Sequence, residues 1–299
     1  MSIGRRPIDA FDHVVIDASS ARNVPVTDGA NNAGTTEAHK EKSMLHAQEW
    51  RSERNHHQHY SVGLAQSADE IEAAQRLRYR VFADELGARL NTRKTGVDID
   101  FYDAYCEHLV VRDEQMGKVV GTYRILTPEA AQRVGSYYSD NEFDLTRLAH
   151  LRPGLVEIGR SCIHPDYRTG TVIALLWAKL AEFMLRGNYR HLIGCASVGM
   201  ADGGHNAANL FVQQIDPHIA PLEYRVFPRH RLPFERLVTG QAAEVPPLLK
   251  GYLRAGAWIC GDPAWDPDFN TADLPLLLAM DRLSPRYARH FLKAEGGGA

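Results

Sequence analysis

The sequence predicts an α/β fold in which helices flank a mixed central sheet. Two observations carry this prediction. Between residues 67 and 280, segments with strand composition alternate with segments whose apolar residues recur at helical spacing. The 299 residues are 44% hydrophobic and 24% charged, and the chain shows neither an internal repeat nor a second independent core. We therefore expect one large domain with appendages.

The charge and the cysteines exclude several classes of protein. A net charge of −3 provides no global attraction to nucleic acid, whose phosphates require a basic excess. The cysteines lie far apart and form no C-x-x-C pair, so we expect buried, reduced thiols rather than a disulfide framework. They are Cys106, Cys162, Cys195 and Cys260.

Residues 1–62 are expected to form a flexible N-terminal arm, and residues 63–293 a single domain with a C-terminal extension. The arm is polar and lacks apolar periodicity. Its histidines have no cysteine or carboxylate framework around them, so we predict no metal site at His56, His57 and His59. No apolar leader and no run of about 18 apolar residues occurs, which predicts a cytoplasmic protein without a membrane span.

The first ordered element is expected near Ser67. Ser67 and Glu70 have the spacing of a capping box, and the apolar residues that follow share one helix face as far as Gly87. Residues 108–113 and 119–126 are rich in β-branched residues and are joined by a short glycine-containing turn, which predicts a hairpin.

A third strand is predicted over residues 155–163, interrupted by Gly159. Apolar residues then recur at helical spacing over 172–184, and Gly187 is a suitable C-terminal stop. The remaining expected elements, in chain order, are a strand (192–197), a helix (206–213), a β-rich stretch (223–227), a short helix (248–255), a short strand (258–260) and an apolar strand (274–280).

The third strand carries two opposite charges, Glu157 and Arg160, in an apolar setting. Burying a carboxylate is costly unless it is paired or hydrogen-bonded, so one interpretation is an internal ion pair. The other is a cleft: a bulge at Gly159 would bring both side chains to one side and separate this strand from its neighbour. The turn over 166–171 adds backbone N–H groups, Arg168 and a helix N-terminus, which suit a phosphate but also a plain connection.

These segments resemble the GNAT superfamily. Residues 77–86 (LRYRVFADEL), 98–103 (DIDFYD), 120–126 (VGTYRIL) and 157–161 (EIGRS) are similar to the branch that contains acyl-homoserine lactone synthases. A closer resemblance, to the ornithine N-acyltransferases of ornithine lipid synthesis, rests on residues 248–258 (LLKGYLRAGAW), 261–266 (GDPAWD) and 269–273 (FNTAD). The resemblance spans about residues 65 to 292 and implies a GNAT fold with a splayed strand.

The resemblance implies transfer of a 3-hydroxyacyl chain from acyl carrier protein to the α-amino group of L-ornithine. The acetyl-CoA loop of the superfamily is degenerate here, where residues 168–173 read RTGTVI, and this suits a phosphopantetheine donor that lacks the adenosine pyrophosphate. No separate cofactor is implied. The expected donor-binding residues are Cys162, Ile163, Arg168, Thr169, Gly170 and Thr171.

Glu157 is the expected base, acting directly or through water, with Arg160 beside it as the second catalytic residue. Backbone N–H groups near Cys162 and Ile163 would stabilise the tetrahedral intermediate. An alternative is an acyl-enzyme on Cys162, with its pKa lowered by Arg160, although no histidine–carboxylate partner is evident.

The amino-acid acceptor requires groups of both signs. Arg124 or Arg160 would bind its carboxylate, and Asp100 or Asp103 its side-chain ammonium. The set of expected substrate-binding residues is Arg78, Phe82, Asp100, Asp103, Arg124 and Ser197. For the aspartates a solvated loop is the alternative, and for Arg78 an exposed helix face.

Two basic segments suggest partners. The densest basic run, with Arg225, Arg229 and Arg231, is the expected docking patch for an acidic carrier protein. The C-terminal segment from Arg282 to Lys293 interleaves basic and apolar residues, which predicts either contact with an anionic membrane or a capping helix. Rival functions are an N-acyltransferase or acyl-homoserine-lactone-like synthase with another acceptor, and a binding module without turnover.

Overall fold

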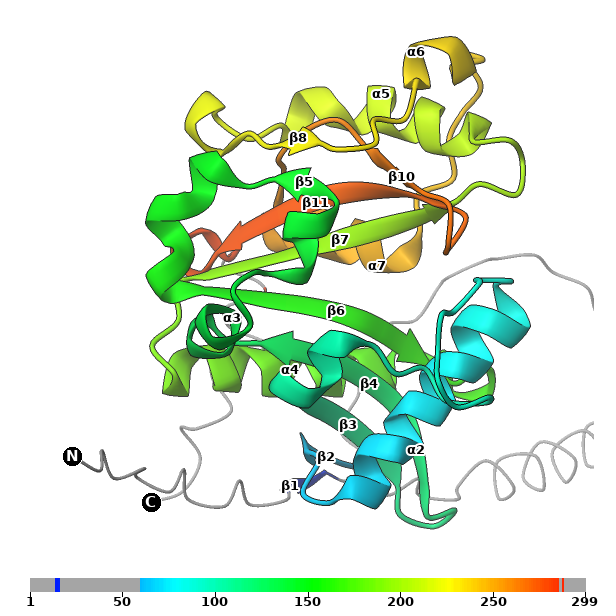
Figure 1. Ribbon diagram of the computed structural model, residues 1–299, viewed down its shortest axis with the longest axis vertical. Helices are drawn as coiled ribbons and strands as arrows, with labels where there is room; N and C mark the ends of the chain where they lie inside the picture. The colour runs from blue at the N-terminus through cyan, green and yellow to red at the C-terminus, as the bar shows by residue number, and fades with distance from the viewer. Residues whose placement is uncertain (1–13, 17–59, 285–286, 288–299) are drawn as a thin grey trace, which may run out of the picture.

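A computed structural model describes residues 14–16, 60–284 and 287 of the chain. They form a nine-stranded sheet in the order β1-β2-β3-β4-β6-β7-β11-β10, with β9 pairing on β11 (Figure 1). The strands are β1 (Val14–Ile16), β2 (Tyr60–Leu64), β3 (Glu107–Asp113), β4 (Lys118–Leu126), β6 (Leu155–Ile163), β7 (His191–Gly199), β9 (Trp258–Ile259), β10 (Ala264–Asp266) and β11 (Thr271–Ala279). A second sheet pairs β5 (Phe143–Asp144) with β8 (Phe227–Pro228).

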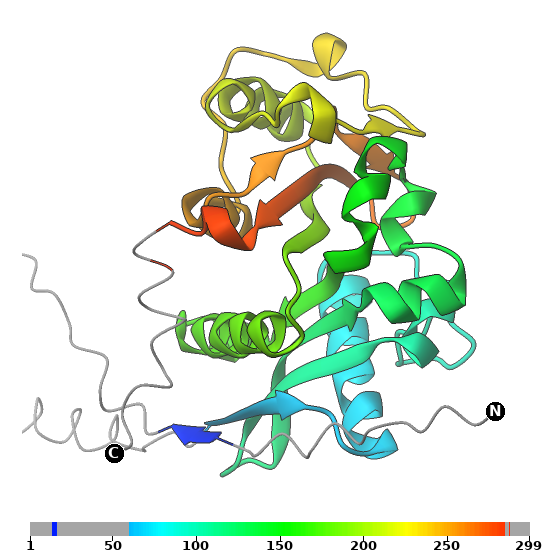
Figure 2. The same cartoon turned by 90° about the vertical axis from the view of Figure 1, so that its left-hand side faces the viewer.

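Helices cover both faces of the sheet. Figure 2 shows α2 and α4 on opposite sides of its N-terminal half. The helices are α2 (Ala68–Tyr79), continued by a π-helix (Arg80–Glu85), α3 (Pro128–Val134), α4 (Thr171–Arg186), α5 (His205–His218), α6 (Phe234–Leu237) and α7 (Pro247–Ala255). Short 3₁₀ turns include Phe101–Tyr105, Tyr138–Asn141 and Leu222–Tyr224. No helix of the described residues is long and apolar enough to cross a bilayer.

Most expected elements are confirmed. The hydroxyl of Ser67 accepts the Glu70 N–H and starts α2, and α4 ends at Gly187. The hairpin is β3–β4, and the third strand has the predicted bounds as β6. Strand-like composition and the helical spacing of apolar residues therefore predict these elements correctly.

Two elements differ from the prediction. β2 precedes Ser67 and pairs with β3, so the expected boundary of the arm at residue 62 falls inside a strand. All five β2 residues are buried, and this removes the polar alternation that marks a half-exposed strand. The predicted β-rich stretch 223–227 begins in a 3₁₀ turn (Leu222–Tyr224), which follows Pro221, and reaches a strand only at Phe227, the first residue of β8.

Several expectations lie largely outside the described residues. They concern the flexible arm, of which the structure describes 14–16 and 60–62, the three clustered histidines, and the C-terminal basic segment beyond Ser284 apart from Tyr287.

The parallel strands β6 and β7 separate after a short pairing. Their register covers three pairs, from Leu155↔His191 to Glu157↔Ile193, and Figure 1 shows the strands diverging beyond it. A bulge in β6 accompanies the separation, because Arg160 and Ser161 together oppose Tyr123 of β4. The bulge was expected at Gly159 and lies at the next two residues, where Arg160 has a left-handed backbone (φ 49°). A non-glycine residue in this region stores strain, as is common at functional sites.

Candidate active site

The separation of β6 and β7 opens onto two adjoining cavities. The smaller one, of about 260 Å³, lies between the strands and contains Glu157, Arg160 and Ser197. The larger one, of about 1420 Å³, lies between α4 and α7 and contains Trp177. Four residues line both: Phe82, Leu86, Ser161 and Leu248. Two substrates, one bound in each cavity, would therefore meet beside the β6 bulge.

Glu157 is buried at the wall of the smaller cavity. Its carboxylate accepts the backbone N–H groups of Tyr138 (2.6 Å) and Ser139 (2.7 Å) and the Ser139 hydroxyl. Burial raises the pKa of Glu157, and these hydrogen bonds oppose part of that rise. No ion pair joins Glu157 to Arg160 in the described part of the chain, so the internal-pair interpretation does not hold. A carboxylate has about four acceptor positions, and one remains for water or substrate.

A buried network of three arginines and three aspartates lies next to the cavity. Arg78 binds Asp98 at 2.7 Å and Asp103 at 2.6 Å, and it is completely buried. Its pKa is raised, because these carboxylates outweigh the opposing effect of burial. Arg78 therefore holds α2 to the 98–103 segment and does not lie in either cavity.

Arg124 and Arg160 extend this network to the cavity wall. Both ion-pair with Asp100, at 2.6 and 3.1 Å, and both line the smaller cavity. Burial alone would raise the pKa of Asp100, but Arg124 and Arg160 lower it overall. The Arg160 guanidinium also lies over the rings of Tyr138 and Phe269, 5.0 and 4.6 Å from their centroids.

The structure contradicts the predicted ammonium-binding role of Asp100 and Asp103. Asp100 and Asp103 do not line either cavity, and their carboxylates are already held by arginines. A second cation there would meet a neutral cluster. Of the expected substrate-binding residues, Phe82, Arg124 and Ser197 face the smaller cavity.

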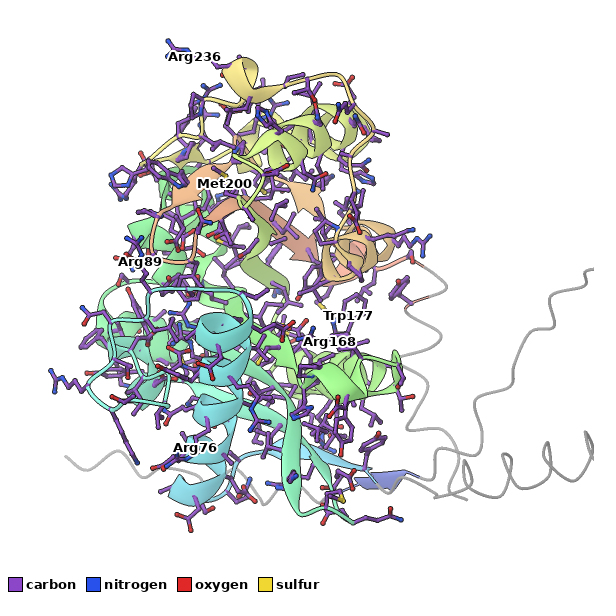
Figure 3. The ribbon with its side chains drawn as sticks, turned by 90° about the vertical axis from the view of Figure 1, so that its right-hand side faces the viewer. Arg76, Arg89, Arg168, Trp177, Met200 and Arg236 are labelled. Carbon is purple, nitrogen blue, oxygen red and sulfur yellow. The ribbon has the colours of Figure 1, made fainter. Side chains whose placement is uncertain are left out.

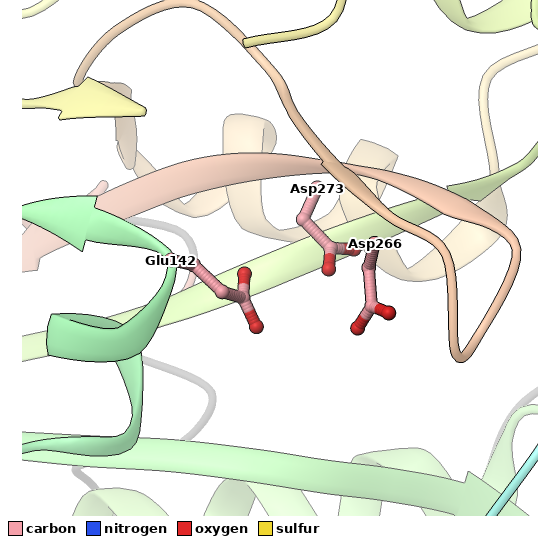
Figure 4. A group of neighbouring side chains, drawn as sticks. All are labelled: Glu142, Asp266 and Asp273. Carbon is pink, nitrogen blue, oxygen red and sulfur yellow. The ribbon is translucent and has the colours of Figure 1, made fainter. Parts of the chain in front are cut away.

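A second acidic group faces the smaller cavity from three separate segments. Glu142, Asp266 and Asp273 each place one carboxylate oxygen within 4.8 Å of the others, and Figure 4 shows the side chains converging. Asp273 is buried, and Glu142 and Asp266 are half-buried. No arginine, lysine or histidine forms an ion pair with them among the residues that the structure describes.

The pKa values reflect this crowding of like charges. Burial and then the neighbouring Asp273 raise the pKa of Glu142 well above its usual range. Burial raises the pKa of Asp273 to about 6, against a hydrogen bond from Ser197. Sequence reasoning missed this group, although Asp266 and Asp273 stand in two of the motifs quoted for the resemblance. No sequence feature indicated Glu142, because it lies in a loop that is far along the chain from both motifs.

The larger cavity contains part of the expected donor site. Cys162, Ile163, Arg168 and Gly170 line it, whereas Thr169 and Thr171 do not. The guanidinium of Arg168 forms two hydrogen bonds with Glu85, at 2.6 and 2.8 Å, so its charge is already matched. α4 begins behind Gly170 (φ 96°) without a side-chain cap, which leaves the amides of its first turn for an anion.

The environment of Cys162 disfavours an acyl-enzyme. Burial raises the pKa of this thiol to about 12, so it stays protonated at neutral pH. Arg160 does not lower the pKa, because its guanidinium is held by Asp98 and Asp100.

The predicted carrier-docking residues do not line the mouth of the larger cavity. Arg225 donates to the Ala220 carbonyl and Arg229 to the Asp140 carbonyl, and Arg231 pairs with Glu235 and Asp262. Besides Arg168, which pairs with Glu85, the larger cavity is lined by two exposed basic residues of α7, Lys250 and Arg254, at its mouth. In Figure 3, Arg168 and Trp177 mark this cavity, and Arg236 from the end of the basic run lies far from it.

Comparisons with known proteins identify the family through two relatives of similar sequence. Residues 77–178 match the model of an acetyltransferase (GNAT) domain. A protein from Brucella abortus (strain 2308) named L-ornithine N(alpha)-acyltransferase is 35% identical over 246 residues, or 77% of this chain and 88% of the relative. One of the same name from Rhodobacter capsulatus is 34% identical over 80% of this chain and 97% of its own. Among solved structures, FeeM, an N-acyl amino acid synthase from uncultured soil microbes, is 13% identical with a TM-score of 0.47, covering 78% of this chain and 94% of its own.

Proposed function

The chain belongs to the family of L-ornithine N(alpha)-acyltransferases, and we propose that it transfers a 3-hydroxyacyl chain from acyl carrier protein to the α-amino group of L-ornithine. Membership establishes an acyltransferase with a GNAT domain. The acceptor and donor are the proposal. The product would be a lyso-ornithine lipid.

The acidic group in the smaller cavity is the observation that supports L-ornithine as the acceptor. Ornithine differs from most amino acids by a second ammonium group at the end of a short side chain. Among the described residues these three crowded carboxyl groups have no cationic partner, so their ionised forms are disfavoured, and a bound ammonium would stabilise the ionised forms. Glu142, Asp266 and Asp273 would hold the side-chain ammonium by charge-assisted hydrogen bonds.

The remaining groups of the acceptor would contact other residues that line the smaller cavity. Arg160 and Arg124 would bind the α-carboxylate, Arg160 more readily because its side chain is 12% exposed against 5%. A short chain of contacts connects Glu157 with the acidic group. The Ser139 hydroxyl bonds Glu157 and lies 3.8 Å from the Cys195 thiol, which lies 3.4 Å from Glu142. The α-amine would thus lie near Glu157 while the side-chain ammonium reaches the acidic group.

The reaction needs no covalent enzyme intermediate. Glu157, directly or through one water, would take a proton from the α-ammonium, and its raised pKa brings it closer to the working pH. The freed amine attacks the thioester carbonyl, and the C–N bond forms. Backbone N–H groups of the unpaired part of β6 would stabilise the oxyanion. The C–S bond then breaks, and the pantetheine sulfur leaves as a thiol with the second proton of the attacking nitrogen, which becomes the neutral amide.

The larger cavity would receive the donor. The first turn of α4 would hold the pantetheine phosphate, and Arg168, fixed by Glu85, would frame it. The carrier protein, being acidic, would dock against Lys250 and Arg254 at the mouth. The thioester would then reach Ser161, which both cavities share.

The direct test is mass spectrometry of the product. Purified protein is incubated with 3-hydroxyacyl carrier protein and L-ornithine, in parallel with Glu157→Gln. We expect 3-hydroxyacyl-ornithine from the parent protein and a rate at least about 100-fold lower from the variant, since removal of a general base costs that much. No product from the parent would refute the proposal, and an unchanged rate in the variant would refute the role of Glu157.

A further inference from the structure

A small group of hydroxyls lies where the two cavities meet. Trp177 Nε1 of α4 donates to the Tyr123 hydroxyl of β4 at 3.0 Å. The Tyr123 hydroxyl lies 2.7 Å from that of Tyr252 on α7, and the Ser161 hydroxyl in the β6 bulge is near enough to oppose part of the rise in the pKa of Tyr123. Tyr123 and Tyr252 line the smaller cavity, Trp177 the larger one, and Ser161 both. The chain thus builds one polar site from four elements.

The hydrogen bonds of this group leave capacity toward the cavity. A hydroxyl offers one donor and two acceptor positions. Tyr123 uses two of them, with Trp177 and Tyr252. In the described part of the chain the Tyr252 hydroxyl makes no other hydrogen bond, and the Ser161 hydroxyl has only the nearby Tyr123 hydroxyl as a polar neighbour, so each retains positions for a ligand.

The surroundings are apolar. The walls beside this group are formed by Ile158, Leu192, Leu248, Ala257, Leu276 and Leu278. Such walls suit the hydrocarbon of an acyl chain. Buried hydroxyls there are costly unless they meet a polar partner.

We infer that the hydroxyls of Tyr252 and Ser161 bind the 3-hydroxyl of the donor's acyl chain. This rests on the proposed function, in which the thioester carbonyl lies beside the backbone of Ser161 and Cys162. The 3-hydroxyl is two carbons beyond that carbonyl, so it would lie close to the point where the two cavities meet. A donor without the hydroxyl leaves these polar groups unpaired, which sets a preference for the 3-hydroxylated chain.

The test compares two donors of equal chain length, 3-hydroxyacyl and unsubstituted acyl carrier protein, with L-ornithine as acceptor. We expect the wild-type kcat/KM to favour the 3-hydroxyacyl donor at least tenfold. Tyr252→Phe should bring the ratio near one by lowering activity on the hydroxylated donor, and Ser161→Ala should move it the same way. Tyr189→Phe, whose ring lies outside both cavities, is the matched control and should keep the wild-type ratio.

Each result is informative. Equal wild-type rates on both donors would refute the inference and leave ornithine acylation intact. An equal loss on both donors in Tyr252→Phe, with thermal unfolding unchanged, would assign the tyrosine to packing and also refute it. Absence of acyl-ornithine from either donor would refute the proposed function, and the inference with it.

Discussion

Asp273 shows how one carboxyl can couple acceptor binding to pH. Burial and, to a smaller extent, the neighbouring Asp266 favour its protonated form and raise its pKa to about 6. The ammonium of a bound acceptor favours the ionised form. Binding therefore depends on protonation of a group that titrates close to neutral pH.

Affinity for L-ornithine should fall as the pH drops through about 6, because protonated Asp273 no longer attracts an ammonium. Calorimetric titration of the protein without donor, from pH 5 to 8, measures this. Asp273→Asn should bind at least tenfold more weakly at pH 8, from the loss of a charge-assisted hydrogen bond, and with a flatter pH profile. Asp268→Asn, exposed in the turn that precedes β11, is the control. A wild-type affinity independent of pH would contradict this role.

The same carboxyl should affect stability in the empty protein. Its folded pKa lies above its unfolded value, so the folded state binds the proton more tightly. Stability is therefore favoured below about pH 4 and declines as the pH rises through 6. At pH 8, urea unfolding should find Asp273→Asn about 1 to 2 kcal/mol more stable than wild type, with the gain shrinking toward pH 4.5. A variant that is less stable than wild type at pH 8 would show that the lost Ser197 bond outweighs the charge.

The separation of β6 and β7 depends on how closely these strands approach at its origin. A Cβ added at Gly194 of β7 would lie 2.5 Å from the Ile158 carbonyl oxygen of β6, so only glycine permits this approach. The bulge at Arg160 follows two residues later. The close contact between β6 and β7 and their divergence therefore originate at neighbouring positions of β6.

Gly194→Ala should destabilise the protein by about 1 to 3 kcal/mol, because backbone rather than a flexible side chain must move. Gly199→Ala, on the same strand with no atom within 4 Å, should be nearly neutral. Chemical denaturation of both variants measures the difference. Equal stabilities would mean that the strands adjust without cost.

The sequence predicts these elements unevenly, for physical reasons. β6 and α4 were predicted with their ends because charge, glycine and apolar spacing mark them locally, and the GNAT fold is confirmed. β2 lacks alternation because both of its faces are buried. The acidic group could not be predicted, since Glu142, Asp266 and Asp273 meet only after the chain folds.

The two cavities give the protein separate entrances for acceptor and donor. Lys250→Glu with Arg254→Glu should raise the KM for acyl carrier protein about tenfold, with little change in the KM for L-ornithine, because the charges at the donor mouth reverse. Arg229→Glu with Arg231→Glu reverses the same number of charges away from that mouth. Steady-state kinetics at low and moderate salt distinguish the two pairs. A larger effect from the second pair would restore the docking surface predicted from sequence.

Competition between acceptors tests the ammonium-binding role of the acidic group most directly. The protein is given 3-hydroxyacyl carrier protein and an equimolar pool of the common amino acids, L-ornithine and norvaline, and the products are identified by mass spectrometry. Norvaline has the same three side-chain carbons as ornithine but no terminal ammonium. We predict 3-hydroxyacyl-ornithine as the dominant product, and a ratio to the norvaline product that falls at least tenfold in Asp273→Asn. A dominant product from a neutral amino acid, or a ratio unchanged in the variant, would contradict the assignment of the three carboxylates.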